Sequence, residues 1–181
     1  GHTSRVDVAE VFSSGEKVIT GGIDSLALVW NVTSCEVVAE MQHDDWVAGV
    51  ALLADGAEVA TITIDGRVAL WSAVSGELLQ VLVGPDHPDF QPFDVGFLPF
   101  PQGDRLLTFT RKEALIWDTA QRYVLHRLRD FPAGLYGVAV SPDGEVVVTC
   151  GGGTVTVWNA SSGERLHLLE ADRASNKYGS E

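Results

Sequence analysis

Two groups of residues in this chain combine an imidazole, a hydroxyl, a carboxylate and an indole at the same spacing. In both groups the aspartate follows the histidine by 22 residues, follows the threonine by 4 and precedes the tryptophan by 6. A histidine between a carboxylate and a hydroxyl is the combination that activates a nucleophile in hydrolases. The first group is His2, Thr20, Asp24 and Trp30, and the second is His43, Thr61, Asp65 and Trp71.

The same residue types can instead hold a fold together. A buried indole N–H needs an acceptor, which a threonine hydroxyl supplies, and that hydroxyl can also bond to an imidazole. A carboxylate then fixes the other ring nitrogen of the imidazole. Because the group occurs twice, it indicates a structural network copied along the chain, and we expect no catalytic residue in it. Cys35 and Cys150 lack the spacing of metal ligands, so no metal site is expected either.

The elements that must position these groups recur four times. Four tryptophans lie 41, 46 and 41 residues apart, and each ends a short apolar run followed by a polar turn and another apolar run. Upstream of each tryptophan, a glycine-containing turn separates two further β-branched or apolar runs. This pattern predicts an all-β fold of four antiparallel sheets with four strands each. The tryptophans are Trp30, Trp71, Trp117 and Trp158.

On these repeats the chain resembles the WD-repeat β-propeller family, whose blades are four-stranded sheets arranged around a channel. The resemblance implies blades at residues 1–41, 42–83, 84–129 and 130–169, and residues 170–181 are expected to be a disordered tail or linker. Seven blades are usual in this family, so four predict a partial or open ring. We expect further blades in a longer chain. A second copy that completes an eight-blade ring and a closed four-blade ring are the alternatives.

The last two repeats depart from the first two. Arg111 and Lys112 occupy the turn where the aspartate is expected in the third repeat, and glycines 151–153 occupy it in the fourth. Phe131 lies at the position of the histidine in the fourth repeat. The third repeat contains an insertion, residues 84–94, in which His87 is a loose match. We predict that these two blades lack the full polar network and that the insertion is a protruding loop.

Composition narrows the class of partner. The net charge of −13 argues against nucleic acid, and no long apolar stretch predicts a membrane span. Two widely spaced cysteines favour a reducing compartment, which predicts the cytoplasm, with the nucleus as an alternative. The chain begins with Gly1 and its only methionine is Met41, so we expect it to derive from a longer protein. Nothing in the sequence predicts a cofactor.

Five residues are candidates for binding a protein or peptide. They lie near the turns between second and third strands or just before first strands, an edge of the predicted ring that we call the rim. The rim is where partners commonly dock in the family that the chain resembles. Tryptophan and arginine are also enriched at binding hot spots. The candidates are Arg5, Trp46, Arg111, Lys112 and Tyr136.

Each candidate also has an ordinary structural interpretation. Trp46 can pack over the neighbouring blade, Arg5 can pair with Asp44 or Asp45, and Arg111 and Lys112 can form a solvated turn. Tyr136 is expected to be half-buried in the channel wall.

The sequence leaves three alternative functions to consider. The first is a non-catalytic scaffold that presents the rim to protein or peptide partners. The second is a sensor or autoinhibitory propeller of a larger multidomain signalling protein. A propeller enzyme is the third and is disfavoured, because the conspicuous histidines belong to the repeated network.

Overall fold

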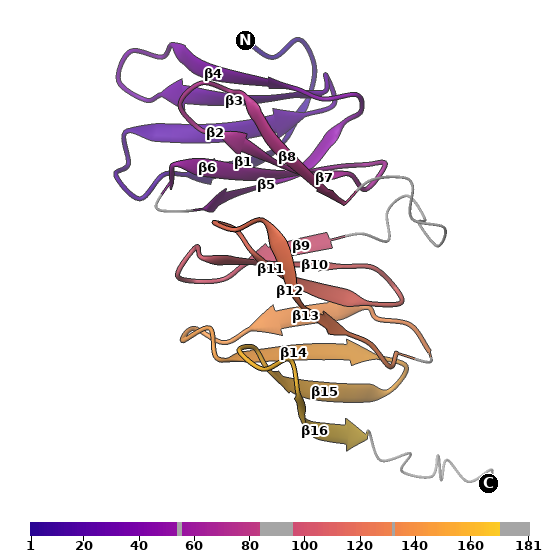
Figure 1. The fold of residues 1–181 in the computed structure, drawn as a ribbon. Helices are drawn as coiled ribbons and strands as arrows, with labels where there is room; N and C mark the ends of the chain where they lie inside the picture. The colour runs from indigo at the N-terminus through magenta and orange to yellow at the C-terminus, as the bar shows by residue number, and fades with distance from the viewer. Residues whose placement is uncertain (54–55, 84–95, 132, 171–181) are drawn as a thin grey trace, which may run out of the picture.

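The computed structural model describes residues 1–53, 56–83, 96–131 and 133–170. Every element in these ranges is a β-strand, and the strands form four antiparallel four-stranded sheets, which confirms the predicted fold class. The sheets follow one another in a row from the first at one end to the fourth at the other (Figure 1). The arc is open. The predicted loop at residues 84–94 and the tail from residue 171 onward lie outside the described residues.

The strands of each sheet pair in chain order. Blade 1 contains β1 (Val6–Val11), β2 (Lys17–Gly22), β3 (Leu26–Asn31) and β4 (Val37–Gln42). Blade 2 contains β5 (Val47–Leu53), β6 (Glu58–Thr63), β7 (Val68–Ser72) and β8 (Leu78–Val83). Blade 3 contains β9 (Gly96–Pro99), β10 (Arg105–Phe109), β11 (Ala114–Asp118) and β12 (Tyr123–Leu128). Blade 4 contains β13 (Gly137–Val140), β14 (Val146–Gly151), β15 (Thr154–Asn159) and β16 (Arg165–Glu170).

The tryptophan of each blade lies at an irregularity in the sheet. In all four blades the pairing of the third and fourth strands shifts register directly before the tryptophan. Such a bulge bends the strand and turns its side chains away from the regular direction.

In the described residues, the apolar core forms three layers, each between two neighbouring blades. Trp71 packs with residues of blade 1 such as Ile19 and Val29. Trp117 packs in the same way with blade 2, and Trp158 packs with blade 3. In blades 2, 3 and 4, the tryptophan therefore faces the blade before it. Burial of these layers is the main source of stability, because one sheet alone leaves its apolar faces in water.

The two end faces of the arc are not covered in this way. Trp71, Trp117 and Trp158 are 7–8% exposed, whereas Trp30 is only partly buried and borders an apolar hollow with Val18 and Val32. At the other end, the outermost strand β16 is exposed along its whole length. In the part of the chain that the structure describes, no helix could span a membrane.

Candidate functional site

One hydrogen bond is common to the four blades. The indole nitrogen Nε1 of each tryptophan donates to the Oγ1 of a threonine on the second strand, at 2.8–2.9 Å. Three of these threonines have at most 2% of their surface exposed, and Thr20 of blade 1 is partly buried. A hydroxyl that is buried and already bonded to an indole is poorly placed to attack a substrate. The threonines are Thr20, Thr61, Thr108 and Thr149.

In blade 1 the network continues through the imidazole to the carboxylate. The Nε2 of His2 lies 2.8 Å from Thr20 Oγ1, and its Nδ1 lies 3.0 Å from both carboxylate oxygens of Asp24. Burial alone would raise the pKa of Asp24. Hydrogen bonds from His2 and from the backbone N–H groups of Thr3 and Leu26 outweigh burial, and they leave that pKa below its ordinary value.

In blade 2 the network takes a different route. The Nε2 of His43 lies 2.9 Å from Thr61 Oγ1, but its Nδ1 faces the carbonyl oxygen of Met41 at 2.9 Å. This arrangement fits a neutral imidazole that donates from Nδ1 and accepts at Nε2. Burial lowers the pKa of His43, although its hydrogen bonds to Met41 and to Ser25 act in the opposite direction.

The expectation that Asp65 orients His43 is therefore wrong. Its Oδ1 accepts a hydrogen bond from the hydroxyl of Thr63 at 2.5 Å and another from the backbone N–H of Arg67 at 3.2 Å. The carboxylate stabilises its own turn, and the imidazole uses a backbone carbonyl in its place.

Blades 3 and 4 keep the tryptophan and threonine but change what surrounds them. In blade 4 the ring of Phe131 meets Trp158 edge-on, with centroids 6.1 Å apart. In blade 3 the buried carboxylate of Glu113 follows the Arg111–Lys112 turn and pairs with Arg127 and Arg129. The described residues contain no group of three or more His, Cys, Asp or Glu side chains placed to hold a metal ion.

Two of the rim candidates contact each other. The guanidinium of Arg111 lies 5.6 Å from the ring centroid of Tyr136, within the range of a cation–π interaction. The backbone holds the pair in place, because the N–H of Leu135 donates to the carbonyl of Arg111 at 2.8 Å. Tyr136 is 64% exposed, so the expectation of a half-buried residue in the channel wall is wrong.

Two further candidates, Arg5 and Trp46, lie in the first two blades. Trp46, directly before β5, is 46% exposed. Arg5 pairs with Asp7 at 2.7 Å, which differs from the expected pairing with Asp44 or Asp45. Asp44 pairs instead with Arg67.

Lys112 is exposed beside Arg111. Its backbone N–H donates to the hydroxyl of Thr110, at 3.2 Å, within the turn.

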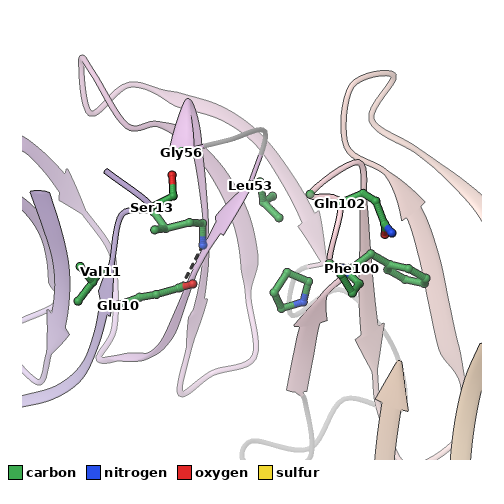
Figure 2. Close-up of a pocket in the computed structure, with 11 residues that line it drawn as sticks. Glu10, Val11, Ser13, Leu53, Gly56, Phe100 and Gln102 are labelled. Atoms are coloured by element: carbon green, nitrogen blue, oxygen red, sulfur yellow. Dashed lines mark hydrogen bonds between the residues drawn. The ribbon is translucent and has the colours of Figure 1, made fainter. Parts of the chain in front are cut away.

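At the opposite end of the sheets, the first turns of blades 1, 2 and 3 surround a hollow of about 320 Å³ that the sequence did not predict. Glu10 and Val11 lie on one side of it and Phe100 and Gln102 on the other, with Leu53 between (Figure 2). We call it the lower hollow. It is assembled from three blades, so no single repeat contains its signature.

Comparisons with known proteins agree with this architecture. The family described as WD domain, G-beta repeat matches residues 123–159, which run from β12 through β15. The chain is 26% identical to apoptotic protease-activating factor 1 of Rattus norvegicus, over 93% of this chain and 13% of that protein. It is also 25% identical to small ribosomal subunit protein RACK1y of Oryza sativa subsp. japonica, over 89% of this chain and 49% of that protein.

A third similar protein is the periodic tryptophan protein 2 homolog of Schizosaccharomyces pombe. It is 30% identical over 58% of this chain and 12% of its own length. The chain thus spans between about an eighth and about half of the length of these three relatives.

Proposed function

We infer the function of this chain from the family to which it belongs, the WD-repeat β-propeller proteins, of which it provides four blades. Proteins of this family generally act as scaffolds for protein interactions. We propose that this chain is a non-catalytic scaffold whose rim binds a protein or peptide. Further blades of a longer chain, or a second copy, would cover the two end faces of the arc.

The observation that carries the proposal is the Arg111–Tyr136 pair. An exposed aromatic ring and a guanidinium are held together between blades 3 and 4, on backbone that is hydrogen-bonded across the two blades. Tyrosine and arginine are prominent in binding hot spots, and a rigid support lowers the entropic cost of binding. Trp46 provides a second exposed aromatic directly before a first strand. Lys112 carries a positive charge next to Arg111, and Arg5, paired with Asp7, offers a further polar contact on the rim of blade 1.

A quantitative pull-down from cell extract tests the proposal. Three forms of the full chain are compared: the unmodified protein, a variant with Trp46→Ala and Tyr136→Ala, and a Tyr123→Ala control. Tyr123 is 49% exposed but lies on the outer strand β12, so it matches the loss of an exposed aromatic away from the rim. We expect the rim variant alone to lose the recovered partners. Equal recovery with all three forms would contradict the proposal.

A second candidate is that the blades form the sensor or autoinhibitory part of a larger multidomain signalling protein. The supporting observation is the similarity to a protein named as a protease-activating factor, of which this chain corresponds to 13%. A nucleotide-binding loop of the form GxxxxGK[ST], found elsewhere in the full-length sequence, would support this candidate. A full-length sequence with propeller blades alone would exclude it.

For localisation we propose the cytoplasm, with the nucleus as the alternative. Cys35 and Cys150 are both free thiols and both exposed, a state that a reducing compartment maintains. Fluorescence microscopy of the tagged full-length protein tests this, and secretion into the medium would contradict it.

A further inference from the structure

The lower hollow contains one ionisable side chain among the described residues that line it, the carboxylate of Glu10. The other described residues of its wall are apolar or uncharged. Leu53 lies between Glu10 and the backbone turn from Pro99 to Gly103, which closes the opposite side (Figure 2). The position of Glu10 follows from β1, where it shares the face of Val8, and Val8 packs towards blade 2.

Glu10 differs in kind from its counterparts in the other blades. Each blade has a glycine with positive φ in its first turn, and the residue five positions before that glycine is equivalent to Glu10. In the other three blades this residue is Ala51, Leu98 or Ala139. A carboxylate in blade 1 therefore replaces an apolar residue at a position that faces the next blade.

In the described part of the chain, one of the two oxygen atoms of the Glu10 carboxylate accepts a hydrogen bond. Its Oε2 accepts a hydrogen bond from the backbone N–H of Leu52 at 3.0 Å, across the junction between blades 1 and 2. Within the described part of the chain, Oε1 has no hydrogen-bond partner. Burial raises the pKa of Glu10, although the Leu52 N–H opposes the shift. A partly desolvated carboxylate is stabilised by a cation brought close to it.

The hollow has the size and shape for one long side chain. Its volume, about 320 Å³, is at the lower end of the range for ligand sites, roughly 300–1,000 Å³. Gly56 borders the hollow and packs closely on Phe12: its φ is 86°, and an added Cβ would lie 2.8 Å from the ring of Phe12. A lysine or arginine would place its charged end at Glu10 and its aliphatic stem towards Leu53 and Phe100, which lie across the hollow.

We propose that the lower hollow binds a lysine or arginine side chain of a partner protein, through an ion pair with Glu10. The site lies at the opposite end of the sheets from the rim, so it is a second docking site with its own specificity. The acidic body of the chain, with net charge −13, favours the approach of a basic segment. The proposal does not depend on what binds the rim.

The test titrates the ¹⁵N-labelled full chain with four alanine pentapeptides that carry lysine, arginine, norleucine or glutamate at the centre. The readout is the chemical shift of the backbone amides of Leu52, Gly56 and Gly103. We expect the lysine and arginine peptides to shift these amides and the norleucine and glutamate peptides to leave them unchanged.

Two variants separate the effect of the negative charge on Glu10 from the effect of the net charge of the chain. Glu10→Gln keeps an acceptor for the Leu52 N–H and should weaken binding of the lysine peptide about tenfold. Glu16→Gln makes the same change of net charge at an exposed residue of the neighbouring turn and should leave binding within about twofold. Equal shifts from the norleucine peptide, unchanged binding by Glu10→Gln, or no shift with any peptide would each overturn the proposal.

Discussion

The first two blades carry the same four residue types at the same spacing, yet they use the carboxylate differently. In blade 1, Asp24 binds the imidazole of His2. In blade 2, Asp65 binds the hydroxyl of Thr63, and His43 turns to a backbone carbonyl. Equal spacing therefore does not guarantee equal hydrogen bonding, because a nearby group can compete for the carboxylate.

The competing group is visible in the sequence once the structure identifies it. Two residues before the aspartate, blade 1 has Gly22, which has no side chain, whereas blade 2 has Thr63. A hydroxyl so close in sequence reaches the carboxylate within the turn, as such local hydrogen bonds commonly do. The hydrogen bond from tryptophan to threonine is the same in the two blades. Four comparisons between blades can test how much the individual side chains of the network contribute to stability.

The largest effect should come from removing a tryptophan that is covered by another blade. Trp71→Ala opens a cavity in the layer between blades 1 and 2 and should lower the free energy of unfolding by about 3–5 kcal/mol. Trp30→Ala, at the partly exposed end face, should cost about 1–2 kcal/mol. Urea unfolding followed by circular dichroism measures both. Equal losses would show that the end face is covered in solution.

Removing the threonine hydroxyl comes next. Thr61→Val leaves Trp71 Nε1 and His43 Nε2 without their buried partner and should cost about 2–3 kcal/mol. Thr149→Val, where Phe131 replaces the imidazole, strands the indole of Trp158 and loses only a long 3.5 Å bond to the carbonyl of Thr156, so it should cost about 1 kcal/mol less. The same unfolding measurement applies. A greater loss in blade 4 would contradict this account of the network.

The third comparison uses pH. Because burial lowers the pKa of His43 in the folded chain, the unfolded chain binds a proton first as the pH falls below about 6.5. Stability should decrease from there downward by at most about 1.4 kcal/mol per pH unit. His43→Phe, which imitates blade 4, should remove this contribution. Unfolding curves between pH 7.5 and 5.5 provide the measurement, and an identical slope in the variant would refute the assignment.

The smallest effect separates the two aspartates. Asp24→Asn weakens bonds to His2 and to the backbone of Thr3 at a carboxylate that is 4% exposed, and should cost about 1–2 kcal/mol. Asp65→Asn should cost less than about 1 kcal/mol, since its bonds remain within one turn. Thermal unfolding resolves the difference. A larger loss at Asp65 would reverse the comparison between the blades.

The sequence was sufficient for the strands and their grouping, because alternating apolar runs, glycine turns and a periodic tryptophan are local signals. It also located Phe131 at the position of a histidine, where the structure finds the ring against Trp158. It could not assign the partner of Asp65, since two acceptable donors lie within reach of one carboxylate. The exposure of Tyr136 depends on the packing of the loop before β13, which carries no periodic signal.

The lower hollow was beyond reach for another reason. It exists only where turns separated by more than 80 residues come together, from Glu10 to Gly103. The one available signal was a glutamate where the other repeats have alanine or leucine. That difference becomes meaningful only when the neighbouring blade is seen to face it.

The fixed orientation of the tryptophans gives the arc a direction. One terminal surface carries Trp30, and the other carries the alternate side of blade 4, with Val148 and Val157. Where two unlike surfaces of identical units bind each other, the contact is head to tail. Such contacts close into a ring only when the rotation from one unit to the next completes a circle. Otherwise they continue into a filament, so whatever caps these two surfaces also determines whether the protein remains a particle of finite size.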